Sequence, residues 1–189
     1  MGDAKKRYAG MISWEDGLKY ESQVRDVKGF EAVKKNISPI LVDVQNKTIE
    51  LLLKDKKSNA HKYVLEIKEK IKKGDYDNKY LAQPQSTNYK RMYTKTQPFH
   101  LTAKENTQSL LNRKIPPNQI AYVLKVKSSG TFPFPKGGWI SFTDDFVLPE
   151  DFRPDDEYYL NAVDLKVKLL FEVANLSLSG TMQKRLDII

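Results

Sequence analysis

The stretch Lys5-Lys6-Arg7-Tyr8-Ala9-Gly10 places three cations directly before an aromatic ring, and a mostly apolar run to Trp14 follows it. This pattern predicts a β-strand over residues 5–14. Asp16-Gly17 comes next and is a signal for a hairpin turn. We therefore predict an antiparallel hairpin whose second strand lies near residues 23–27.

The residue types of the same stretch are suited to binding nucleic acid. Lysine and arginine neutralise phosphates, and a tyrosine offers a flat face and a hydroxyl to a sugar or a base edge. A basic run near a terminus is also typical of a solvated tail. These six residues alone therefore leave both interpretations open.

Two helices are predicted after the hairpin. The segment from about Ser38 to Lys54 has a serine cap, Pro39 at the first helical position and apolar residues at helical spacing. A second helix from about Asn59 to Lys73 ends at Gly74. Lysines are expected on the outer face of this second helix, and they indicate either plain solubility or a raised potential for DNA. They are Lys56, Lys57, Lys62, Lys68, Lys70, Lys72 and Lys73.

Residues 75–100 lack a sustained period, and we predict loops there. Within them, Tyr89–Thr96 interleaves tyrosines, cations and hydroxyls, as backbone recognition of nucleic acid does. From Pro98 to about Asn112 the pattern is helical again. Its leucines are predicted to lie in the core, namely Leu101, Leu110 and Leu111.

The last third of the chain is predicted to hold one strand and one helix. Residues 119–127 alternate as a strand does, and residues 128–139 form an irregular stretch rich in Gly, Pro and Phe. Asp155 or Asp156 is expected to cap a final helix from about Glu157 to Ala174. The chain after the first thirty residues therefore reads as one mainly helical domain.

Composition narrows the class of protein. The 189 residues suffice for one good core, and no apolar run approaches the length of a membrane span. The chain has no cysteine, which excludes disulfide scaffolds, thiolate zinc sites and cysteine nucleophiles. A reducing cytosol fits this, so we expect a cytoplasmic protein without membrane contact.

Charge is distributed unevenly along the chain. Residues 1–136 carry 27 Lys and Arg against 14 Asp and Glu, whereas residues 137–189 carry 5 against 10. A basic body with an acidic end is typical of a polyanion binder. Lysine outnumbers arginine 26 to 6, which favours phosphate contacts over bidentate reading of bases. We therefore expect binding that depends little on the base sequence of the nucleic acid.

Short pieces follow one another along the chain in a characteristic order. They are Lys5–Ala9, the predicted hairpin, Gly29–Lys35, Tyr93–Pro98, Ala103-Lys104, Ile120–Val123 and Asp156–Tyr159. In order and spacing they resemble the end of the palm and the thumb of archaeal-type family B DNA polymerases. The resemblance covers all but about the last dozen residues.

The resemblance implies a mainly α fold with a small β portion: an N-terminal hairpin remnant of the palm over residues 1–30 and a helical thumb domain over 31–189. It implies a fragment, or the small subunit of a split enzyme, that grips primer-template duplex DNA during replication. The family's catalytic aspartates, one in a Tyr-x-Asp-Thr-Asp hairpin, and its two Mg²⁺ ions belong to the palm. This sequence lacks that motif, so no catalytic residue is expected in this chain, which alone should be inactive. Its partners would be the exonuclease, palm and fingers regions.

The resemblance also implies DNA contacts. Lys6 and Tyr8 match the Lys-x-Tyr element that holds the primer terminus from the minor groove, with Lys5 and Arg7 beside it. Lys34 and Lys35 match a basic pair before the first thumb helix. Tyr93, Lys95, Thr96 and Lys104 fall where the thumb loops of the family meet the phosphates. Lys90 and Arg91 are candidates because of the interleaved composition of Tyr89–Thr96.

Other interpretations stay open. The chain could be a basic RNA-binding or ribonucleoprotein component, or a small enzyme with a metal at Asp144-Asp145, although a turn there and a helix cap at Asp155-Asp156 are favoured. The two histidines, His61 and His100, are too few for a zinc site. Residues 183–189 faintly resemble a sliding-clamp-binding peptide but lack its aromatic pair.

Overall fold

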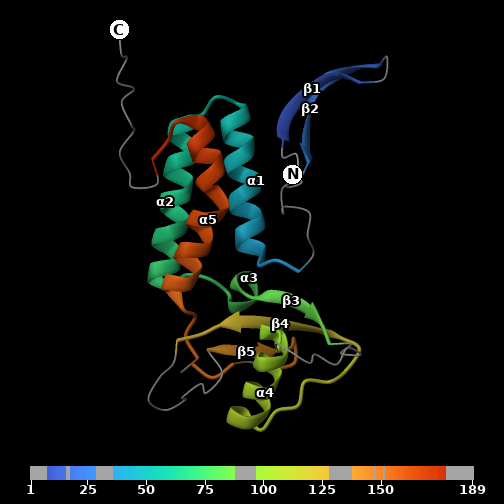
Figure 1. Cartoon of the computed structure of the whole chain (residues 1–189), viewed down its shortest axis with the longest axis vertical. Coiled ribbons are helices and arrows are strands. Elements are labelled where there is room, and N and C mark those ends of the chain that lie inside the picture. Colours follow the sequence, from blue (N-terminus) through green and yellow to red (C-terminus); the bar gives the residue numbers. More distant parts are fainter. Residues whose placement is uncertain are drawn as a thin grey trace, which may run out of the picture. The chain divides into compact units, whose positions relative to one another are not determined.

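The computed structural model describes residues 8–15, 18–28, 36–87, 97–127, 138–146, 148–150 and 152–177. The chain divides into two compact units, which we treat separately (Figure 1). The bundle unit comprises Met1–Lys34, Leu41–Glu69 and Ala162–Ile189, and the sheet unit comprises Lys35–Ile40 and Lys70–Asn161.

The predicted hairpin is present. Strand β1 (Tyr8–Glu15) pairs antiparallel with β2 (Leu18–Lys28), from Tyr8 opposite Lys28 to Glu15 opposite Leu18. The register shifts once, between Ile12 and Trp14. β2 has three more residues than β1, because one residue separates Ile12 from Trp14 whereas four separate their partners Val24 and Lys19. The turn residues 16–17 and residues 5–7 lie outside the described residues.

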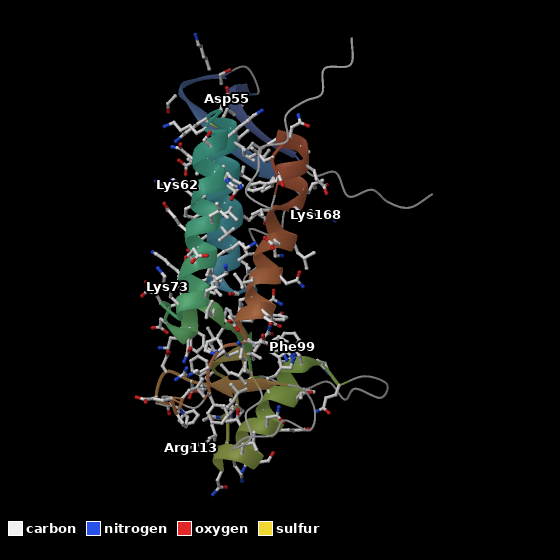
Figure 2. All side chains as sticks on the ribbon, turned by 90° about the vertical axis from the view of Figure 1, so that its left-hand side faces the viewer. Asp55, Lys62, Lys73, Phe99, Arg113 and Lys168 are labelled. Atoms are coloured by element: carbon white, nitrogen blue, oxygen red, sulfur yellow. The ribbon has the colours of Figure 1, made fainter. Side chains whose placement is uncertain are left out.

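Three long helices supply the bundle unit: α1 (Pro39–Leu53), α2 (Lys57–Lys73) and α5 (Asp156–Ala174). In both views their parts in this unit run side by side (Figures 1 and 2). Apolar side chains at helical spacing are buried along each helix, as the periodicity predicts. They include Val44 and Ile49 on α1, Val64 and Ile67 on α2, and Val163, Val167 and Phe171 on α5.

The three helices end in the same way. Asp55, Gly74 and Asn175 follow the last turns with left-handed backbone, at φ 54°, 69° and 54°. After α2 the Gly74 N–H donates to the Ile71 carbonyl and the Asp75 N–H to the Lys70 carbonyl, both at 3.0 Å. This pair of bonds satisfies carbonyls that a helix end otherwise leaves unpaired. The predicted stop at Gly74 is confirmed.

The sheet unit holds a three-stranded antiparallel sheet in the order β3-β4-β5. The strands are β3 (Gln83–Ser86), β4 (Ile120–Lys125) and β5 (Trp139–Phe142), and a short helix, α3 (Asn78–Leu81), precedes β3. β4 was predicted, β3 lies within residues 75–100, where loops were expected, and β5 begins at the end of the irregular stretch and was not predicted. The prediction of a mainly α fold with a small β portion is confirmed.

Helix α4 (Phe99–Leu111) packs on β5 and corrects one prediction. Leu101, Leu110 and Leu111 are only half-buried, whereas the buried residues are small or polar. Those residues are Thr102, Ala103, Asn106 and Thr107. They are buried because they face the open edge of β5, where polar side chains can pair with backbone groups. Asn106 donates its Nδ2 to the Trp139 carbonyl at 2.7 Å, and Thr107 Oγ1 accepts from the Ser141 N–H at 2.8 Å.

Within the described residues, no helix combines the length and the apolar character that crossing a membrane requires.

Candidate nucleic-acid interface

Most predicted DNA-contact residues lie outside the part of the chain that the structure describes. They are Lys5, Lys6, Arg7, Lys34, Lys35, Lys90, Arg91, Tyr93, Lys95 and Thr96. Two predicted residues are described: Tyr8 begins β1, and Lys104 is half-buried on α4. Tyr8 belongs to the bundle unit and Lys104 to the sheet unit, so the structure does not place any two predicted residues against each other.

Of the seven lysines predicted on the outer face of the second helix, six are exposed, and Lys68 is the exception. Lys68 lies 2.8 Å from Asp164 of α5, so it joins two helices instead of facing solvent. The charge of Lys62 is compensated by Glu66, whose Oε1 lies 3.8 Å from Lys62 Nζ. Three of the exposed lysines stand in the last turn of α2, at Lys70, Lys72 and Lys73. Lys62 and Lys73 are labelled along α2 in Figure 2.

This last turn of α2 forms one wall of a pocket of about 390 Å³ in the sheet unit, which we call the basic pocket. Its charged residues are four cations and one carboxylate, and the pocket therefore carries an excess of three positive charges. The lining residues are Ile71, Lys72, Lys73, Gly74, Tyr76, Asn78, Leu81, Lys127, Arg153, Pro154 and Asp156.

Backbone bonds position the second wall of the basic pocket. The Lys127 N–H donates to the Arg153 carbonyl at 3.0 Å, and the Asp155 N–H donates to the Lys125 carbonyl at 3.0 Å. Val126 and Pro154 form a β-bridge between these two bonds. The segment before α5 is thus fastened to the end of β4, which brings Lys127 and Arg153 together.

Side chains reinforce the same junction. Lys127 forms an ion pair with Asp156, which raises the pKa of Lys127 and lowers the pKa of Asp156. The Lys125 N–H donates to the Tyr159 hydroxyl at 3.0 Å, and burial raises the pKa of Tyr159. Asp155 Oδ1 accepts from the Tyr158 N–H at 3.1 Å, which confirms the predicted cap of α5.

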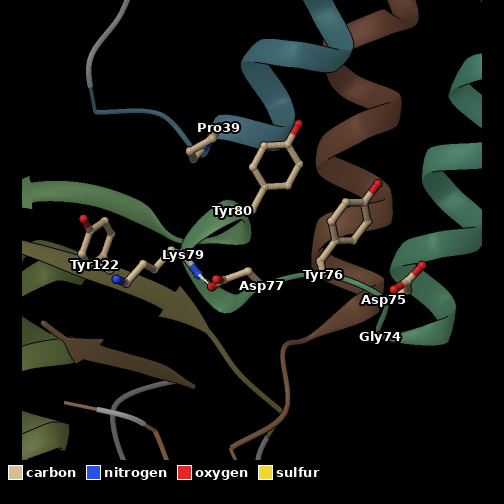
Figure 3. Close-up of a pocket in the computed structure, with 8 residues that line it drawn as sticks. All are labelled: Pro39, Gly74, Asp75, Tyr76, Asp77, Lys79, Tyr80 and Tyr122. Atoms are coloured by element: carbon tan, nitrogen blue, oxygen red, sulfur yellow. Dashed lines mark hydrogen bonds between the residues drawn. The ribbon is translucent and has the colours of Figure 1, made fainter. Parts of the chain in front are cut away.

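A second, open groove of about 800 Å³ also lies in the sheet unit; we call it the tyrosine groove (Figure 3). It is lined by Pro39, Gly74, Asp75, Tyr76, Asp77, Lys79, Tyr80 and Tyr122, and it shares Gly74 and Tyr76 with the basic pocket.

The charges of the tyrosine groove do not favour phosphate. Two carboxylates line it against one lysine, and Lys79 Nζ lies 2.5 Å from Asp144 and 5.4 Å from the centre of the Tyr122 ring. The carboxylates of the tyrosine groove repel a negatively charged phosphate, whereas the neighbouring basic pocket carries positive charge. Of the two, the basic pocket is the better candidate for a polyanion.

The carboxylates considered for a metal have other partners. Asp144 pairs with Lys79, and Asp145 accepts from the Thr143 hydroxyl at 2.5 Å, which lowers the pKa of Asp145. Among the described residues there is no group of three or more His, Cys, Asp or Glu that could hold a metal ion. The described carboxylates therefore do not fit the pair of Mg²⁺ ions that polymerase chemistry requires, and we assign them no such role.

The two histidines lie beside aromatic rings. His61 on α2 is 6.0 Å from Phe171, measured between ring centres. His100 is 5.7 Å from Phe99, and burial lowers the pKa of His100.

Sequence reasoning missed Lys127 and Arg153. The only local signals are that Lys127 ends the β4 pattern and that Arg153 precedes a proline and a helix cap. Neither signal indicates that the two residues meet, because the pairing between residues 125–127 and 153–155 depends on tertiary structure.

Comparisons with known proteins give this geometry a context. Among solved structures, the family B DNA polymerase from the hyperthermophilic archaeon Pyrobaculum calidifontis is similar, with a TM-score of 0.58 at 19% identity. The match covers 99% of this chain and 21% of that chain, so this chain spans about a fifth of that polymerase. No curated protein sequence matches. A family model described as DNA polymerase family B matches residues 3–174, and the chain therefore belongs to that family.

Proposed function

We propose that the chain is the thumb of a family B DNA polymerase, over residues 31–189, joined to the last hairpin of the palm, over residues 1–30. Its work is to grip primer-template duplex DNA behind the active site and so promote processive replication. The observation that carries the proposal is the family match over residues 3–174, which includes both the hairpin and the helical region. The boundary near residue 30 lies outside the described residues.

In this proposal, two kinds of contact hold the duplex. Lys6 and Tyr8, with Lys5 and Arg7, meet the minor groove at the primer terminus, where the acceptors are similar for all base pairs. The other predicted residues contact phosphates, and they are Lys34, Lys35, Lys90, Arg91, Tyr93, Lys95, Thr96 and Lys104. The excess of lysine over arginine supports binding that does not select a sequence.

The catalytic aspartates and their two Mg²⁺ ions belong to the rest of the polymerase in this proposal. The chain alone binds DNA but performs no catalysis. Its partners are the exonuclease, palm and fingers regions of an archaeal-type, cytoplasmic enzyme, and residues 183–189 are a candidate contact for a sliding clamp.

Primer extension by the assembled polymerase tests the predicted hairpin contacts. Lys6→Ala combined with Tyr8→Ala should weaken binding of the primer terminus and shorten the products made in one binding event. Lys19→Ala, at an exposed position of β2, is the matched control and should leave the products unchanged. Unchanged extension by the double variant would argue against the proposed contacts.

A competition experiment distinguishes duplex-DNA binding from the RNA-binding alternative. Single-stranded and folded RNA are added to the full chain bound to a labelled primer-template duplex. We expect the duplex to be retained at equal concentrations of phosphate. Displacement by RNA at lower concentrations would favour the ribonucleoprotein function instead.

A further inference from the structure

We propose that the basic pocket binds a phosphate group of a nucleic-acid strand. This inference rests on the proposed function, because it names a contact surface for the duplex. It uses residues outside the predicted DNA-contact set, chiefly Lys73, Lys127 and Arg153, which three segments far apart in the sequence bring to one place.

The pocket has the form of a built site. Ile71 and Leu81, which are each 4% exposed, supply an apolar floor beneath the charged side chains. One wall is fixed by the turn at Gly74 and the other by the bonds between residues 125–127 and 153–155. Because the backbone on both sides is held, binding of an anion has to order side chains but not the backbone.

The dipoles of the two helices that end at the pocket do not determine the sign of its charge. α2 presents its C-terminal end, which carries a partial negative charge, whereas α5 begins at Asp156 and presents a partial positive charge of similar size. These two contributions oppose each other. Asp156 is paired with Lys127, so this carboxylate does not cancel the charge of Lys73 or Arg153.

The side chains match phosphate chemistry. Arginine presents a planar fork of donors that fits two phosphate oxygens, and lysine adds a compact point charge. Lys73 and Arg153 are exposed, and the Lys127 side chain remains 52% exposed in its ion pair. A phosphate on a strand at the surface can therefore reach these cations while the rest of the strand stays in solvent.

The test compares two double variants of the full chain. Lys73→Ala with Arg153→Ala removes two cations from the pocket, and Lys114→Ala with Lys168→Ala removes two exposed cations elsewhere. Fluorescence anisotropy measures the Kd for a labelled primer-template duplex over a salt series, and equal melting temperatures establish that both variants fold.

The two variants should differ in affinity and in salt dependence. The pocket variant should bind roughly tenfold more weakly at low salt, as removal of charged hydrogen bonds implies. Its plot of log K against log salt should be shallower by about 0.9 for each phosphate that the variant no longer neutralises. The control should change its Kd by less than about threefold because neither of its cations lines the basic pocket.

Titration with inorganic phosphate distinguishes a strand phosphate from a free one. Backbone amides of Gly74, Lys127 and Arg153 are followed by nuclear magnetic resonance in the parent chain and in the pocket variant. Shifts caused by duplex at low concentration, and by inorganic phosphate only at much higher concentration, support the strand as the source. Both sets of shifts should disappear in the variant.

The outcomes separate this inference from the proposed function. If the parent chain binds duplex and the pocket variant binds as the control does, the inference is overturned and the thumb function stands. If the parent chain binds no duplex while inorganic phosphate shifts the pocket amides, the thumb function fails and the pocket is a site for free phosphate. If neither ligand has an effect, both proposals fail.

Discussion

Thr107 and Tyr159 each give a strand a side-chain partner in place of a neighbouring strand. The Thr107 hydroxyl lies 2.8 Å from both the Ser141 N–H and the Ser141 carbonyl, and Tyr159 receives the Lys125 N–H. Periodicity identifies Tyr159 as an inward-facing residue of α5 but does not identify Thr107. No local sequence signal indicates that a helical threonine will pair with the backbone groups at the edge of a sheet.

Thr107→Val tests this edge interaction. Valine keeps the shape but removes the hydroxyl, which leaves buried backbone groups of Ser141 without that partner. The free energy of unfolding should fall by about 1–3 kcal/mol, measured by chemical denaturation. Ser109→Ala on the exposed side of the same helix is the control and should stay within about 0.5 kcal/mol. Equal stabilities for the two variants would show that the Thr107 bonds do not matter.

Glu50 leads to a prediction of how the stability of the fold depends on pH. Hydrogen bonds from Lys54 and Lys47 lower the pKa of Glu50 from 4.5 to about 2. A depressed folded-state pKa stabilises the fold above the ordinary value, and this stabilisation is lost as the pH falls from about 4.5 towards 2. The difference in melting temperature between the parent chain and Glu50→Gln should therefore be present near neutral pH and vanish near pH 2. The pairs are exposed, so the difference should be small. A difference that does not vary with pH would contradict this explanation of Glu50.

At the scale of elements, local signals predicted some structure and missed the rest for identifiable reasons. Pro39, Gly74 and Asp155 mark helix ends through their own backbone and side-chain chemistry, and the structure places all three at such ends. β3 escaped prediction because its residues, Gln83–Ser86, have no apolar alternation and pair with β4 alone. β5 has only four residues and follows a stretch rich in Gly and Pro.

Gly74→Ala tests the end of α2. No atom lies within 4 Å of an added Cβ, so the cost should come from the left-handed backbone at φ 69° and not from a clash. We expect a decrease of about 1 kcal/mol in the free energy of unfolding. Gly10→Ala in β1 has equally open space and no positive φ, so it should be neutral or slightly stabilising. Equal effects at the two glycines would contradict the backbone explanation.

At the scale of the whole molecule, the sequence predicted the protein family, whereas the polyanion-binding site that it indicates stays a prediction. The basic excess of residues 1–136 indicated a polyanion, and the resemblance indicated a DNA polymerase family that the family match confirms. The basic pocket could not be predicted, because Lys73, Lys127 and Arg153 meet only through the fold. Conversely, ten of the predicted DNA-binding residues lie outside the described residues and remain predictions.

The most direct test of the proposed function is a salt series of fluorescence-anisotropy titrations, with the full chain added to a labelled primer-template duplex and to its separated strands. We predict that the duplex binds more tightly than either strand, whatever its sequence. The slope of log K against log salt should be about −2.7 or steeper, which corresponds to roughly three or more phosphates at about 0.9 each. An affinity for duplex that does not change with salt would contradict the proposed grip on phosphates.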